Sequence, residues 1–156
     1  MGQLINDVFE IGLTELIGID EEVNTDDMSG SVAVTVGPNG PVSGTFKAFA
    51  FISSDGAILE PTGALIILDA DPAVSSGDTA MTVAEYQSVV GIVNVASGDW
   101  LTADANAAVA YVMDEIPFHS VETLYFVFDY TLATDFNDGS GDDELLQVNA
   151  WFQRED

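Results

Sequence analysis

Apolar residues recur at every second position along much of the chain, which is the spacing of a β-strand that buries one face. The segments with this pattern, or with a short apolar run, are bounded by Gly, Pro, Asn or Asp residues that favour turns. They cover residues 32–36, 44–52, 63–68, 89–95, 107–113, 122–133 and 144–152. Short strands at this spacing predict an all-β fold, a single jelly-roll-like β-sandwich with at most one or two short helices.

The segment at residues 44–52 differs from the others because it is apolar on both sides. Strict alternation would divide its residues between two faces, with Phe49 and Phe51 on one face and Phe46, Ala48, Ala50 and Ile52 on the other. A strand of this kind is expected either inside a sandwich or in a contact between subunits.

Helical signals are sparse. Thr82 and Glu85 have the spacing of a capping box, which predicts a short helix over about residues 83–89. Residues 1–19 fit a strand and a helix about equally, and we expect an N-terminal arm or edge strand there, followed by a β-sandwich domain over residues 20–156. Residues 20–30 are rich in Asp and Glu and are expected to form a solvated acidic loop.

The charge balance restricts the partners. The 156-residue chain has 27 acidic residues against two cationic ones, Lys47 and Arg154, and a formal net charge of −25. Binding to nucleic acid requires clustered Lys and Arg, as does binding to an anionic membrane surface, so neither partner is expected. The acid excess is compatible with simple solubility, with a saline medium, or with a partner that has a basic surface.

The remaining composition is that of a globular domain. Hydrophobic residues make up 47% of the chain, enough for a core, and the length fits one domain. No apolar window of about 18 residues predicts a transmembrane helix, and the first residues do not have the pattern of a signal peptide. The absence of cysteine excludes disulfides and thiolate metal sites.

Candidate chemistry is limited to His119 and two acidic segments. A lone histidine acts as a general base only beside a nucleophile and an orienting acid, and the neighbouring Ser120 would point to the opposite face of a strand. His119 is therefore expected to serve packing or hydrogen bonding. With 27 acidic residues, carboxylate pairs carry no signal for glycoside hydrolysis.

The acidic segment at residues 135–144 offers hard oxygen ligands of the type that Ca²⁺ prefers, in Asp135, Asn137, Asp138, Asp142 and Glu144. It fails the EF-hand pattern and fits a single nonapeptide repeat where several would be needed, so a hairpin loop is the favoured interpretation. A weaker candidate, residues 69–72, is expected to form a turn at Pro72 with an Asx-type bond from Asp69. We assign no catalytic, cofactor-binding or metal-binding residue from the sequence.

Short blocks in the later part of the chain occur in a fixed order: EPTG at 60–63, LIILDADP at 65–72, SGDT at 76–79, AEY at 84–86, VNV at 93–95, DW at 99–100, PFH at 117–119, LYF at 124–126, FND at 136–138, GDDE at 141–144 and NAWFQR at 149–154. Together they resemble the head decoration, or capsid cement, proteins of marine-type tailed bacteriophages. The resemblance covers about residues 60–156 and contains no catalytic motif.

That resemblance implies a structural virion protein that binds the lattice of the major capsid protein and stabilises the outer capsid surface after synthesis in the host cytoplasm. It implies a homo-oligomer, with a trimer favoured, and neither catalysis nor a cofactor. Two alternatives remain open: another structural β-module of a virion, from a tail or fibre, and a cytoplasmic protein-binding domain of a halophilic or marine organism.

The charge balance generates a prediction about salt. Self-repulsion among the carboxylates should destabilise the fold at low ionic strength, and screening should relieve it. The melting temperature is therefore expected to rise from low salt to about 1 M NaCl, where the Debye length falls to about 3 Å. Differential scanning fluorimetry across this range tests it, and a melting temperature that stays flat or falls would contradict it.

Overall fold

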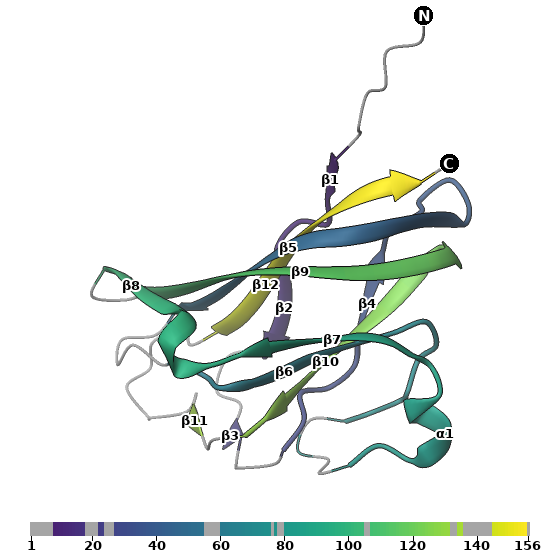
Figure 1. Ribbon diagram of the computed structural model, residues 1–156. Coiled ribbons are helices and arrows are strands. Elements are labelled where there is room, and N and C mark those ends of the chain that lie inside the picture. The colour runs from purple at the N-terminus through teal and green to yellow at the C-terminus, as the bar shows by residue number, and fades with distance from the viewer. Residues whose placement is uncertain are drawn as a thin grey trace, which may run out of the picture.

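The computed structural model describes residues 8–17, 22–23, 27–54, 60–75, 77, 80–104, 107–131, 134–135 and 145–155. Within these residues the chain is almost entirely β, and two antiparallel sheets pack face to face (Figure 1). The helical elements described are α1 (Val83–Tyr86) and the 3₁₀ turn at Ser97–Asp99. The predicted all-β sandwich with at most one or two short helices is confirmed.

The larger, six-stranded sheet has β1 (Val8–Glu10) at one edge, followed by β12 (Leu145–Glu155), β5 (Val42–Ser54), β9 (Ala107–Val121) and β8 (Trp100–Asp104), and β2 (Thr14–Ile17) also pairs with β12. The four-stranded sheet has the order β4 (Val32–Thr35), β10 (Thr123–Tyr130), β6 (Gly63–Leu68) and β7 (Val89–Val95). A short ribbon pairs β3 (Glu22–Val23) with β11 (Thr134–Asp135).

The strand pairing is that of a jelly roll. Setting aside the short β1, β3, β8 and β11, the first strand pairs with the last and the rest nest inside: β2 with β12, β4 with β10, β5 with β9, and β6 with β7. All four pairs are antiparallel and they alternate between the two sheets. A long hairpin rolled up on itself has this topology, which confirms the jelly-roll prediction from the chain's own connectivity.

The main core lies between the two sheets and is rich in aromatic side chains. The ring of Phe46 is the centre of this group, with its centroid 5.2 to 6.2 Å from those of Phe49, Phe118, Phe126 and Phe152. These five side chains are 0 to 4% exposed. Aromatic rings at these separations add directional contacts to the burial of apolar area, so the group fixes how the sheets pack.

The alternation expected for residues 44–52 is wrong at one position. Relative to β12, β5 contains one extra residue, because Trp151 and Phe152 are consecutive while their partners Ala48 and Phe46 are two apart. This β-bulge at Lys47 reverses the alternation, so Phe46 shares the inner face with Phe49 and Phe51. A bulge has no simple sequence signal, which explains the error.

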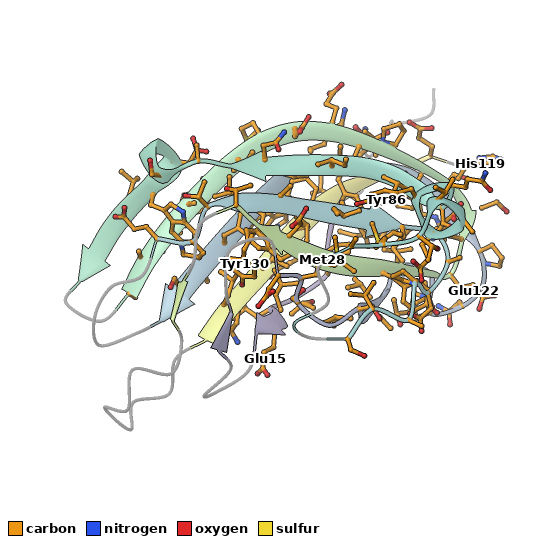
Figure 2. The ribbon with its side chains drawn as sticks, turned by 90° about the horizontal axis from the view of Figure 1, so that it is seen from below. Glu15, Met28, Tyr86, His119, Glu122 and Tyr130 are labelled. Atoms are coloured by element: carbon orange, nitrogen blue, oxygen red, sulfur yellow. The ribbon has the colours of Figure 1, made fainter. Side chains whose placement is uncertain are left out.

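A second apolar cluster covers the outer face of the four-stranded sheet. In this cluster, side chains of β6 and β10 pack against side chains from the segment after β6 and from the segment before β4. Its members are Ile66, Leu68, Val127, Val74, Met81 and Met28. Figure 2 shows the sheet from this side, with Met28 lying against it. The chain therefore buries both faces of β6, in agreement with its uninterrupted apolar sequence.

The solvated loop expected at residues 20–30 is wrong where the structure describes this range, since Glu22–Val23 form β3. Asp27, Met28 and Ser29 are buried, at 8%, 1% and 0% exposure. Ser29 donates its backbone N–H to the carbonyl of Phe128, and its hydroxyl accepts from the Phe128 N–H. The end of the acidic segment thus extends the four-stranded sheet beside β10. Residues 20–21 and 24–26 lie outside the described residues.

The capping box is confirmed, because Thr82 accepts from the Glu85 N–H and the Glu85 carboxylate accepts from the Thr82 N–H. The helix is shorter than expected, since β7 begins at Val89. The sequence pattern missed β8, and it also missed the extension of β9 through Pro117. A proline has no backbone N–H to donate and is tolerated where a strand lacks a neighbour on one side. β8 pairs only with residues 107–110 of β9, so it is not a neighbour of Pro117.

The two described strands of residues 1–19 both lie along β12. Phe9 of β1 stacks on Phe152, with ring centroids 5.5 Å apart, and Leu16 of β2 is 4% exposed within the main core. Val8 is the first described residue and is already paired with β12, and residues 1–7 lie outside the described residues.

A pair of glycine substitutions tests the packing of β6 on β10. A Cβ at Gly63 would overlap the carbonyl oxygen of Asp129 and lie 2.8 Å from the Phe128 ring, so backbone would have to move. Gly63→Ala should lower the free energy of unfolding by about 1–3 kcal/mol. Gly98→Ala is the control, because its Cβ meets no atom within 4 Å, and a change of at most about 0.5 kcal/mol is expected. Urea unfolding measures both, and equal stabilities would refute the contact.

Candidate protein-binding face

His119 is held by a serine far away in sequence. Ser43 Oγ lies 2.9 Å from His119 Nδ1, and the backbone N–H of Ser120 donates to the same oxygen at 2.9 Å. The register explains the arrangement, because His119 and Ser120 together face Ser43, between the pairs Val42–Val121 and Gly44–Phe118. Ser120 adopts a left-handed φ of 53° in this bulge. Its backbone N–H has no partner in the strand pairing and is satisfied by Ser43 Oγ.

This geometry agrees with the hydrogen-bonding role expected of His119, which stays a prediction. A serine hydrolase needs an acid on the second ring nitrogen and N–H donors aimed at an oxyanion. Within the described residues no carboxylate is hydrogen-bonded to the His119 ring. The sequence could not have identified Ser43, which lies 76 residues from His119.

The two acidic segments considered as metal sites, residues 135–144 and 69–72, differ in how much of each the structure describes. Residues 136–144, together with the side chain of Asp135, lie outside the described residues. In the other candidate, the Asx-type bond comes from Asp71 and not from Asp69 as expected: Asp71 Oδ1 accepts from the Ala73 N–H at 2.8 Å and from Ser31 Oγ at 3.0 Å. No group of three His, Asp or Glu in the described part of the chain could hold a metal ion.

The feature that distinguishes this molecule is the outer face of the six-stranded sheet. Cross-strand partners share a face, and three rows run across the sheet. They are Trp151–Ala48–Met113, Asn149–Ala50–Tyr111, and Gln147–Ile52–Val109–Leu101. We call the apolar members of these rows the apolar face: Ala48, Ala50, Ile52, Leu101, Val109, Tyr111, Met113 and Trp151.

Burial places these side chains on the outside of the sandwich. Ala50 is 4% exposed yet belongs to neither core cluster, which agrees with its place in a row of the outer side. Leu101, Tyr111 and Met113 are 66%, 66% and 78% exposed. Large apolar side chains that are exposed together on adjacent strands are uncommon on monomeric proteins and mark interaction surfaces.

Charged groups border the apolar face on two sides. Glu10 and Glu15 lie at the β1–β2 edge, opposite Trp151 and Gln147 respectively, and the Glu10 carboxylate accepts a hydrogen bond from the Asn149 amide. Farther along β9, Lys47 Nζ lies 2.7 Å from Glu115 Oε1. The hydrogen bond and charge of Lys47 lower the pKa of Glu115, because both favour the ionised carboxylate.

The sequence signal for the apolar face was present but incomplete. The apolar character of residues 44–52 on both sides indicated a possible subunit contact. The pattern of β9 did not, because Tyr111 and Met113 alternate with Ala110 and Val112 and the inner face could not be told from the outer one. No helix in the described part of the chain has the length and hydrophobicity to cross a membrane.

No family model and no curated protein matches this chain. Among solved structures, it is similar to a chain of the Israeli acute paralysis virus full particle heated to 63 degrees, at 7% identity and a TM-score of 0.43, over 97% of this chain and 72% of that one. It is also similar to dimeric latent PorU from Porphyromonas gingivalis, at 13% identity and a TM-score of 0.36, over 96% of this chain and 13% of that one. Such identities concern the fold alone, so function is argued from the chain's own surfaces.

The structural role of His119 is testable with a fluorophosphonate probe, which labels serine hydroxyls that a histidine activates. We expect Ser43 to remain unlabelled, because its oxygen already accepts the Ser120 N–H and no described acid orients the ring. Mass spectrometry of the intact protein measures the adduct. Labelling of Ser43 that disappears in His119→Ala would instead identify a reactive dyad.

Proposed function

We propose that this chain is a structural virion protein that decorates and stabilises the outer surface of a capsid by binding the lattice of the major capsid protein. The observation that carries the proposal is the apolar face. It is an exposed surface of the kind that binds other proteins, on a jelly roll that is otherwise strongly acidic. The resemblance of the ordered residue blocks over residues 60–156 to capsid cement proteins supports this choice of partner.

The physical demands on such a protein agree with the chain. A decoration protein is present in many copies and must not aggregate before it meets the capsid, and a net charge of −25 keeps such a protein in solution. It also needs a surface that loses water on contact, which the apolar face supplies. A jelly roll by itself is shared by proteins of many functions, so these surface properties support the proposal more than the fold does.

Binding through a homo-oligomer, with a trimer favoured, would strengthen the attachment. Several weak contacts on one oligomer raise the overall affinity by about 10²–10⁴ over a single contact without any new interaction. The proposal therefore includes a preference for the assembled lattice, because only the lattice presents neighbouring sites at a fixed spacing.

A co-sedimentation experiment tests this proposal. The purified full chain is mixed with capsids assembled from the major capsid protein of the same genome, and in parallel with unassembled capsid subunits. We expect saturable binding to capsids at concentrations where binding to free subunits is negligible. Equal binding to subunits and capsids would contradict the lattice preference, and binding to neither would favour a tail, fibre or cytoplasmic protein.

A further inference from the structure

We propose that the apolar face is the docking surface, and that its partner is a protein surface on the assembled capsid with an apolar centre and a border of Lys and Arg side chains. This inference rests on the proposed function and adds to it which side of the jelly roll meets the capsid and what chemistry the capsid presents there.

The two outer faces of the sandwich differ in a way that identifies the docking side. The outer face of the four-stranded sheet is covered by the chain itself, where Met28, Val74 and Met81 bury Ile66 and Leu68. Figure 1 shows α1 and its adjoining segments on that side, and no described helix or strand over the outer side of β5 and β9. The described part of the chain therefore leaves one of its two sheets without a covering element, and this sheet presents Leu101, Tyr111 and Met113 to solvent.

The local geometry favours a folded partner over a single extended peptide. The exposed side chains belong to two neighbouring strands, β8 and β9, and the rows continue through β5 to Trp151 of β12. They form a surface that reaches from the β8 edge of the sheet to β12. The backbone groups of β5 already pair with β9 and β12, so strand addition is excluded at β5 and side chains must provide the contact there.

Charge indicates the chemistry of the partner's border. Glu10, Glu15 and Glu115 border the apolar face on two sides, whereas the apolar residues of its centre carry no charge. Lys47, the cation beside the face, is already paired with Glu115. A partner with basic groups at matching positions would gain complementary potential at the rim and speed its encounter with the chain.

A second copy of this chain fits the face less well. Stacking two such faces would bring two acidic borders together, and each copy carries a net charge of −25. Like charges brought together at an interface cost several kcal/mol, and the chain has few cations to offset them. Charge complementarity therefore favours a basic-bordered partner, and self-association becomes an outcome of the test.

Two matched substitutions test the centre of the face. Met113→Glu places a carboxylate among the apolar rows, and Val83→Glu places the same group on α1; the two native side chains are 78% and 80% exposed. We expect Met113→Glu to weaken capsid binding at least about tenfold, because docking would bury an unpaired charge. Val83→Glu should bind as the wild type does. Both variants should unfold at the wild-type urea concentration, since both sites are exposed.

A second pair tests the border. Glu15→Lys and Glu122→Lys change the net charge by the same amount, but Glu15 borders the face, whereas Glu122 lies in the turn between β9 and β10, at the end of the molecule that carries His119 (Figure 2). Glu15→Lys should slow association several-fold at low salt and weaken its salt dependence, and Glu122→Lys should have a smaller effect on both. Surface plasmon resonance on immobilised capsids measures the association rates.

The outcomes separate this inference from the function on which it rests. If wild-type chain does not bind capsids, the proposed function fails. If the wild type binds and Met113→Glu binds equally well, only the docking face is overturned. If Glu15→Lys strengthens binding, the border of the partner is acidic and the charge argument is wrong. If Met113→Glu instead dissociates an oligomer in analytical ultracentrifugation, a second copy occupies the face.

Discussion

The orientation of the side chains on β5 is the constraint on which the rest of the molecule depends. This strand lies between β12 and β9, and the bulge at Lys47 changes which side of the sheet its residues face. Without the bulge, Phe46 would point outward and the aromatic group between the sheets would lose its centre. With it, three phenylalanines of one strand face inward, and the outer side is left with Ala48, Ala50 and Ile52. One inserted residue therefore determines both the core and the shape of the apolar face.

Acidity sets the second constraint, because the fold must hold together with almost no internal ion pairs. Lys47 and Arg154 are the chain's two strong cations, and the bridge from Lys47 to Glu115 is largely exposed, so it contributes little to stability. Stability must come from apolar burial and from backbone pairing, which the nested jelly-roll pairing supplies along every long strand. The chain as a whole is strongly acidic, whereas the apolar face is exposed and uncharged. This contrast makes the apolar face informative about function.

The sequence predicted the class of fold and most of the strands, because period-2 alternation and turn residues are local signals. The three-residue spacing of Thr82 and Glu85, which is also a local signal, located the capping box. Local signals failed where the outcome depends on a partner strand: the bulge at Lys47, the extension of β9 through Pro117, and the bond from Ser43 to His119 all follow from register across the sheet. The apolar face was only partly predictable for the same reason, since Tyr111 and Met113 can be assigned to the outer side only once β5 and β8 are in place.

The jelly-roll topology and the apolar face constrain each other. Pairing the first strand with the last leaves β12 inside the six-stranded sheet, flanked by β5 and by the strands that contain Phe9 and Leu16. The middle of that sheet is consequently closed to further strand pairing, and a partner can approach it only through side chains. A broad apolar surface whose central strands are already paired suits attachment to a preformed surface better than it suits a catalytic cleft. The arrangement thus supports the proposed binding role, with specificity in a broad face and its charged border.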